Sequence, residues 1–232
     1  MRYNVQDDTN NKDVSMNSLR FLYFGIVLAL MSCNTADKSF ELESGDLLFS
    51  VGSGNSELLG AIQSSTSKKE EIPFSHVGIV SVEENRIYVI EATSPEGVIK
   101  SNIDDFFEKA ARQGDKTLIA VGRLNPQWRY TIPEALEVAE KYLGREYDYL
   151  YTESNDAFYC SELVRRVFTD STGAPLFEPL AMSFKNKETD VTEPFWEEHF
   201  GKLNSSVPEG EPGTNPADMA RSEIIRIVHT YY

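Results

Sequence analysis

Cys160 and His76 are the residues whose types and places in the chain most clearly suggest chemistry. Cys160 directly precedes an amphipathic helical pattern over residues 161–168. A helix N-terminus carries partial positive charge, which favours the reactive thiolate over the thiol. An imidazole beside such a thiol could take its proton and later return it to a leaving group. The simpler interpretation of Cys160 is a small buried side chain with no reaction to perform.

Glu91 could complete this pair if the chain forms the hairpin that its pattern predicts. Residues 76–82 and 86–92 are two β-rich runs separated by a short polar segment. A two-residue turn at 84–85 makes His76 and Glu91 diagonal neighbours on one face, within reach of each other. A slip of one residue would place them on opposite faces. The alternative for Glu91 is an edge-strand charge that points to water.

Other kinds of site have little support in the sequence. His199 lies in an aromatic helical pattern over 195–200, and His229 lies near the C-terminus in the last predicted strand. Two cysteines are too few for a thiolate zinc site or a disulfide framework. The sequence contains no glycine-rich phosphate loop and no HxxxH pair. It therefore predicts a reaction that needs no metal and no cofactor.

Composition limits the class of partner. The chain has 232 residues, of which 41% are hydrophobic and 25% charged, a mixture typical of one globular domain. Its 22 Lys and Arg against 37 Asp and Glu give a net charge of −15. Such a chain repels phosphate backbones, so nucleic acid is not an expected partner.

Alternating and helical patterns predict an α+β fold with a mostly antiparallel sheet, in which Cys160, His76 and Glu91 could lie close together. Strands are expected at 47–51, 76–82, 86–92, 118–124 and 223–228, and helices at 104–113, 132–143, 161–168 and 195–200. Residues 52–73 are expected to form a loop with one or two helical turns, and residues 201–218 a long loop.

The N-terminal segment predicts export. Residues 21–31 form an apolar run that follows Arg20 and is too short to span a bilayer. The run ends in Leu30-Met31-Ser32-Cys33, which resembles the lipobox of bacterial lipoproteins and implies that Cys33 carries lipid and begins the mature protein. The alternative is a signal peptide cleaved nearby, with Cys33 incidental.

These features divide the chain into a signal peptide at 1–32, a lipidated tether at 33–43 and one domain at 44–232. The residues before Met16 lack the positive charge with which a signal normally begins, so we expect translation to start at Met16. A lipid anchor at Cys33 would place the domain in the cell envelope, facing the periplasm or at the outer membrane.

Four segments in order resemble the YiiX/YebB-like permuted papain-like hydrolases, a group within the superfamily of NlpC-type cell-wall peptidases. They are Ser44-Gly45-Asp46-Leu47-Leu48-Phe49, Ser75-His76-Val77-Gly78-Ile79, Ile90-Glu91-Ala92 and Tyr159-Cys160-Ser161-Glu162-Leu163-Val164. The resemblance implies a permuted papain-like fold, with Cys160 as nucleophile, His76 as general base and acid, and Glu91 as the group that orients the imidazole. It also implies a substrate-binding role for Tyr159, Tyr147 and Asp148, although packing explains the last two equally well.

The resemblance implies a cysteine hydrolase that cleaves amide bonds through a thioester acyl-enzyme. Cell-wall peptides or related small amides are the implied substrates. One alternative is an acyltransferase of the same fold that acts on lipids, which a narrow apolar pocket would favour. The other is a ligand-binding lipoprotein without catalysis, for which a reactive thiol would be unnecessary.

Overall fold

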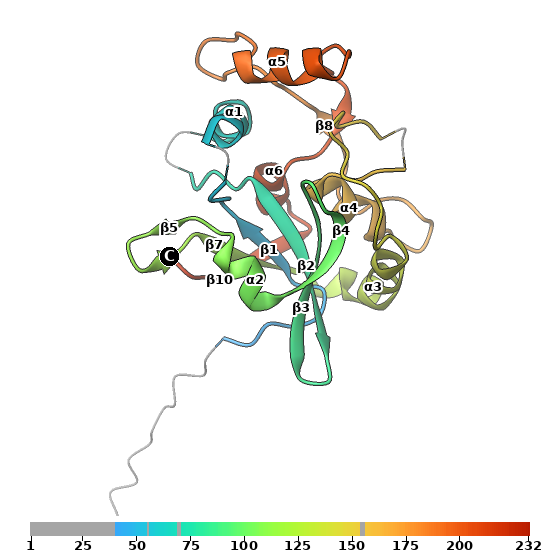
Figure 1. Cartoon of the computed structure of the whole chain (residues 1–232). Coiled ribbons are helices and arrows are strands. Elements are labelled where there is room, and N and C mark those ends of the chain that lie inside the picture. The colour runs from blue at the N-terminus through green and yellow to red at the C-terminus, as the bar shows by residue number, and fades with distance from the viewer. Residues whose placement is uncertain (1–39, 55, 69–70, 154–155) are drawn as a thin grey trace, which may run out of the picture. The chain divides into compact units, whose positions relative to one another are not determined.

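A computed structural model describes residues 40–232 except 55, 69–70 and 154–155 (Figure 1). The expected signal peptide, Met16, Cys33 and the tether up to residue 39 lie outside these residues. The compact unit begins at Phe40, four residues before the expected start of the domain. Phe40 and Leu42 belong to it because both pack against its buried apolar side chains.

The centre of the unit is a six-stranded sheet in the order β10-β7-β1-β2-β3-β4, and its neighbouring strands are all antiparallel. The strands are β1 (Leu47–Ser50), β2 (His76–Glu83), β3 (Arg86–Thr93), β4 (Gly97–Asn102), β7 (Ile119–Leu124) and β10 (Ile225–Thr230). The prediction of a mostly antiparallel sheet with helices is confirmed, and β4 is a strand that the sequence patterns did not indicate.

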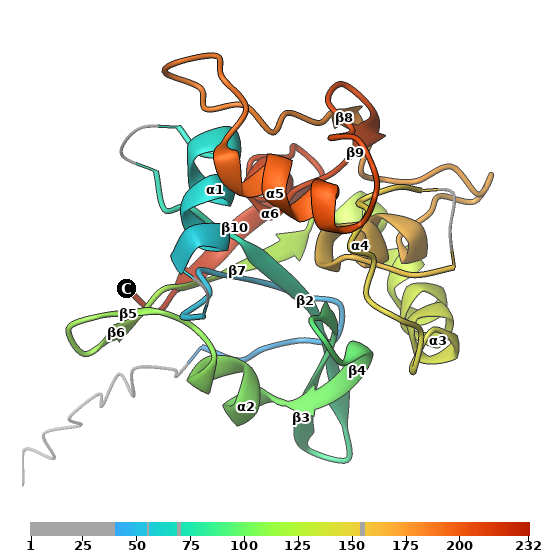
Figure 2. The same cartoon turned by 45° about the horizontal axis from the view of Figure 1, so that its top comes forward.

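Helices and short ribbons surround this sheet (Figures 1 and 2). The helices are α1 (Ser56–Thr66), α2 (Ile103–Glu108), α3 (Ile132–Lys141), α4 (Cys160–Val167), α5 (Pro194–Lys202) and α6 (Pro216–Ala220), with a 3₁₀ turn η1 (Pro126–Thr131). The ribbons pair β5 (Arg112–Gln113) with β6 (Lys116–Thr117), and β8 (Leu180–Ala181) with β9 (Pro212–Gly213). None of the described helices is both long and apolar enough to cross a membrane.

Three expectations about these elements are wrong in part. The predicted helix at 104–113 ends at Glu108, because Gly114 adopts a positive φ of 67° in the tight turn between β5 and β6 instead of ending a helix. The expected loop at 52–73 contains the eleven-residue helix α1. The expected loop at 201–218 contains β9 and α6, the latter capped by the side chain of Asn215.

The sheet buries both of its faces because successive side chains of a strand point to opposite sides. On one face Phe49 and Ile79 pack with Leu163 of α4, and α3 packs against α4. On the other face Leu48 and Val80 pack with Phe106 of α2. The contact of α4 with β2 and β3 brings the start of that helix to the beginning of β2, where the site lies.

A third apolar cluster lies away from the sheet, between α1 and α5. Its buried members are Ala61, Phe184, Trp196 and Phe200. Figure 2 shows α1 and α5 side by side at the edge of the unit, and residues of the two helices are in contact. We call this group the α1–α5 cluster.

Candidate active site

Cys160 is the first residue of α4, as its place before an amphipathic pattern predicts. Tyr159 precedes the helix in an extended conformation, with φ −93° and ψ 167°. The first backbone N–H groups of a helix have no acceptor inside it, so the thiol lies beside partial positive charge. Cys160 is 7% exposed and lines a cavity.

The hairpin that carries His76 and Glu91 has the predicted register. Glu83 pairs with Arg86 and Ile79 with Ile90, across a two-residue turn. Both turn residues have positive φ, 46° at position 84 and 65° at 85, as such hairpin turns require. The Nε2 atom of His76 lies 2.5 Å from the Oε2 atom of Glu91, so the two side chains do meet.

The imidazole of His76 contacts both the carboxylate and the thiol. Burial lowers the pKa of His76, but hydrogen bonds to Cys160 and Glu91 and the charges of these two groups outweigh it and raise the pKa to about 10. Because Glu91 holds Nε2, the nitrogen left for Cys160 is Nδ1. An imidazolium between two acidic groups favours the thiolate form of the cysteine.

Two residues that the sequence did not single out hold Glu91 in place. Ser101 of β4 donates its hydroxyl to Oε1 at 2.8 Å, and the Nζ atom of Lys109 lies 4.0 Å from the same oxygen. Burial raises the pKa of Glu91, whose residue is 1% exposed, but His76, Ser101 and Lys109 together lower it below its ordinary value. The carboxylate is therefore charged and fixed on both oxygens, and Ser101 is the outer member of a chain that reaches Cys160.

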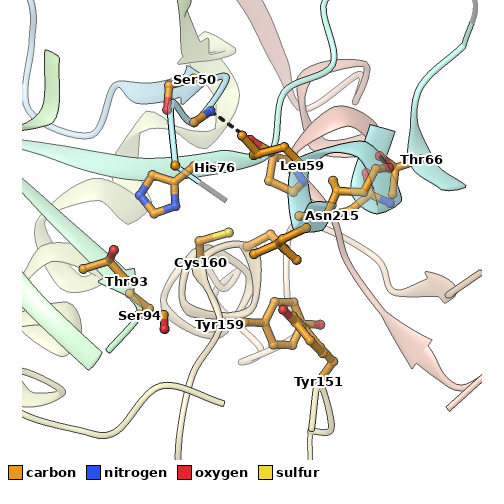
Figure 3. Close-up of a pocket in the computed structure, with 18 of the residues that line it drawn as sticks. Ser50, Leu59, Thr66, His76, Thr93, Ser94, Tyr151, Tyr159, Cys160 and Asn215 are labelled. Carbon is orange, nitrogen blue, oxygen red and sulfur yellow. Dashed lines mark hydrogen bonds between the residues drawn. The ribbon is translucent and has the colours of Figure 1, made fainter. Parts of the chain in front are cut away.

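The thiol and imidazole open into a cavity of about 370 Å³. Figure 3 shows His76 and Cys160 next to one another at this cavity, with the rings of Tyr159 and Tyr151 on the side of Cys160 away from His76. Tyr159 and Tyr147 line it, as the resemblance implies for substrate-binding residues. The hydroxyl of Tyr159 accepts a hydrogen bond from the backbone N–H of Thr214 at 3.2 Å, and burial raises its pKa to about 12, so the phenol stays protonated.

Asp148 lies in a packing position, one of the two roles that the sequence leaves open for it. It is buried and is not among the residues that line the cavity. Its two carboxylate oxygens accept hydrogen bonds from the backbone N–H groups of Leu150 and Thr152, at 2.8 and 2.7 Å. These bonds shape the loop that carries Tyr151, which lines the cavity.

The two other histidines lie apart from the cavity, as expected. The Nε2 atom of His199 contacts the backbone oxygen of Tyr149 at 2.8 Å. The ring of His229 stacks on Phe40 with 4.4 Å between centroids. Neither residue lines the cavity.

Glu162 is a buried acid two residues after the nucleophile in α4, and no sequence pattern singled it out. It is 0% exposed, and neither of its carboxylate oxygens has a hydrogen-bond partner among the described residues. Burial, and then the charge of Asp148, raise its pKa to about 8. Glu162 is therefore mostly protonated at neutral pH and adds little negative charge beside Cys160.

Comparison with known proteins extends these observations. A family model described as "Permuted papain-like amidase enzyme, YaeF/YiiX, C92 family" matches residues 41–229. The chain is 27% identical to the Escherichia coli K12 protein named "Uncharacterized protein YiiX" over 157 residues, which cover 67% of this chain and 70% of that protein.

A solved structure has the same fold. The crystal structure of the metalloprotein YiiX from Escherichia coli O157:H7 superimposes with a TM-score of 0.67 and 22% identity, covering 83% of this chain and 99% of that one. Within residues 40–232, apart from the short undescribed gaps, no group of three or more His, Cys, Asp and Glu side chains is arranged to hold a metal ion.

Proposed function

This chain belongs to the permuted papain-like amidase family and is a cysteine hydrolase of that family, and we propose that Cys160, His76 and Glu91 are its catalytic residues. The observation that carries the proposal is the position of His76, which contacts the thiol at the start of α4 and the Glu91 carboxylate at 2.5 Å. Nucleophile, base and orienting group are the parts that such catalysis needs.

The reaction begins with attack of the Cys160 thiolate on an amide carbonyl carbon. The His76 imidazolium then gives its proton to the departing amine as the C–N bond breaks, which leaves a thioester on Cys160. The neutral imidazole next takes a proton from water, and the resulting hydroxide attacks the thioester carbonyl. The C–S bond then breaks, which releases the acid and the Cys160 thiolate. The proton taken from water stays on His76, so the thiolate–imidazolium pair is restored.

The developing negative charge on the carbonyl oxygen needs donors near Cys160. The backbone N–H of Cys160 opens α4 and has no acceptor within the helix. The Tyr159 hydroxyl accepts from Thr214 and keeps its own proton for donation. We propose these two groups as the oxyanion neighbours, since a donor aimed at such a charge typically contributes about 10²- to 10³-fold in kcat.

We propose cell-wall peptides or related small amides as the substrates, by analogy with NlpC-type peptidases. Fluorogenic peptide amides incubated with the purified protein should be hydrolysed, while Cys160→Ala should be inactive. Product analysis in the presence of an added alcohol distinguishes hydrolysis from acyl transfer. Absence of turnover together with an unreactive Cys160 would support the alternative of a ligand-binding lipoprotein.

We propose further that lipid on Cys33 anchors the protein in the cell envelope, where such peptides occur. The lipobox-like sequence that ends at Cys33 supports this location. Metabolic labelling with a radioactive fatty acid should label the wild-type protein and not Cys33→Ser. Equal labelling of both proteins, or labelling of neither, would contradict the anchor.

A further inference from the structure

The charged side chains of the cavity lie together at one end. Of the described residues that line it, those with charged side chains are His76, Glu91 and Lys109. His76 and Glu91 bond to each other, and Lys109 approaches the same Glu91 carboxylate at 4.0 Å. The charges of the cavity are therefore gathered at the catalytic end, although the chain as a whole carries a net charge of −15.

One face of α1 forms an apolar wall beyond this end. Leu58, Leu59 and Ile62 line the cavity at the spacing of successive turns on one helix face. Leu59 reaches toward the end of β1, since a Cβ atom placed on Gly52 would lie 3.2 Å from a Leu59 methyl group. Figure 3 shows Leu59 across the cavity from the Tyr159 and Tyr151 rings.

The apolar lining continues from α1 into the α1–α5 cluster, against which Leu58 and Ile62 pack. Met182, Phe184 and Trp196 line the cavity, and the last two are buried side chains of the cluster. Tyr151 joins this wall to the site, because its ring lies 5.7 Å from that of Trp196 and 5.3 Å from that of Tyr159. Tyr151 adopts a positive φ of 53°, a strained conformation that the surrounding rings hold in place.

The apolar side chains of the cavity have no charge to offer a charged substrate group, and the hydroxyls of Ser65, Thr66 and Ser183, which line the cavity near them, already donate to other groups of the protein. A carboxylate or an ammonium placed against these apolar side chains would lose its water and find no opposite charge, which is costly. An apolar group there would leave water for contact with methyl groups and aromatic rings, which is favourable.

We propose that the substrate carries an apolar group beside the scissile amide, a straight acyl chain or an apolar amino acid side chain, which binds in the cavity against Leu59 and Ile62 of α1 and against Phe184 and Trp196. This inference rests on the proposed function, because Cys160 at the catalytic end is taken to mark the position of the scissile bond. It narrows the substrate class to amides with an apolar neighbouring group, and it makes Ile62 and Phe184 specificity-determining residues.

The test measures second-order alkylation rates of Cys160 with a series of N-alkyl chloroacetamides, from N-methyl to N-octyl, each divided by its rate with glutathione. Cys33→Ser protein leaves Cys160 as the one thiol of the sequence. The normalised rate should rise about fourfold per methylene until the cavity is filled. Reagents of hexyl length that end in a carboxylate or an ammonium should react more slowly than the plain hexyl reagent.

Two substitutions, one inside the cavity and one control outside it, are tested with the same reagents. Ile62→Trp fills the apolar part of the cavity and should lower the ratio of the hexyl to the methyl rate at least tenfold. Val191→Trp adds the same ring at an exposed position that does not line the cavity, and the ratio should stay unchanged. A rate that is flat with chain length, or faster reaction of the charged reagents, would overturn the proposal.

Hydrolysis separates this inference from the proposed function. Rates of hexanoyl and acetyl coumarin amides, and of leucyl and glycyl coumarin amides, show whether acyl chains or amino acid side chains are preferred, and either preference supports an apolar subsite. A clear length effect in alkylation without hydrolysis of any amide would keep the apolar site and refute the hydrolase. Hydrolysis of small peptide amides, together with alkylation rates that do not depend on chain length, would keep the hydrolase and refute the apolar site.

Discussion

Substitution of the buried acid Glu162 by glutamine should change how the stability of this protein depends on pH. Glu162 is 0% exposed, its carboxylate oxygens have no hydrogen-bond partner among the described residues, and its pKa is raised from 4.5 to about 8. The folded protein keeps this proton up to about pH 8, while the unfolded chain releases it near 4.5. The stability that the protonated acid provides is therefore complete below pH 4.5 and is lost as the pH rises toward 8.

The size of the loss follows from the two pKa values. A rise from 4.5 to about 8 corresponds to about 5 kcal/mol in the free energy of unfolding, at 1.36 kcal/mol per pKa unit. Glutamine has nearly the same shape as the protonated acid and does not ionise. The stability of Glu162→Gln relative to wild type should therefore increase by about 1.4 kcal/mol per pH unit between pH 5 and 8 and then level off.

Urea unfolding at pH 5, 6, 7 and 8 measures this difference directly. Glu84→Gln is the matched control, because the Glu84 side chain is 88% exposed, and its stability relative to wild type should not change with pH over this range. A difference between Glu162→Gln and wild type that is constant from pH 5 to 8 would refute the reasoning. It would mean that Glu162 is ionised and paired in the folded protein.

Three further predictions concern the residues around the imidazole. Ser101→Ala removes the hydroxyl that holds Glu91 and should lower kcat about tenfold with little change in KM. A variant that is less stable but keeps the wild-type kcat would contradict a positioning role. Gly78→Ala places a methyl group in overlap with a β3 side chain and should cost about 1–3 kcal/mol in urea unfolding, while Gly60→Ala, with no atom within 4 Å, should not destabilise the protein. Because the pKa of His76 is raised to about 10, kcat should not fall as the pH rises through 6.5 and should decline only near pH 10; a decline near 6.5 would show that the imidazole lacks its acidic partners.

The hairpin and its two site residues were predictable because they depend on local signals. The two-residue turn at 84–85 determines the pairing of β2 with β3, and that pairing places His76 beside Glu91. The position of Cys160 follows in the same way from the amphipathic pattern of α4, which begins at that residue. In each case a few adjacent residues carry the information.

The parts that were missed depend on contacts between distant segments. Ser101 reaches Glu91 from β4, a six-residue strand whose second half is polar and gives no apolar alternation. The expected helix at 104–113 ended early because Gly114 turns a hairpin, and glycine suits either role. The α1–α5 cluster joins segments more than a hundred residues apart, so sequence periodicity alone could not reveal the cavity wall.

The pH dependence of Cys160 alkylation tests the central claim most directly. Iodoacetamide is reacted with Cys33→Ser protein and with the same protein carrying His76→Ala, from pH 4 to 10. Cys160 of the first protein should react much faster at pH 6 than glutathione does, and His76→Ala should abolish this excess reactivity. If both proteins react as ordinary or buried thiols with the same pH dependence, the Cys160–His76 pair is not catalytic.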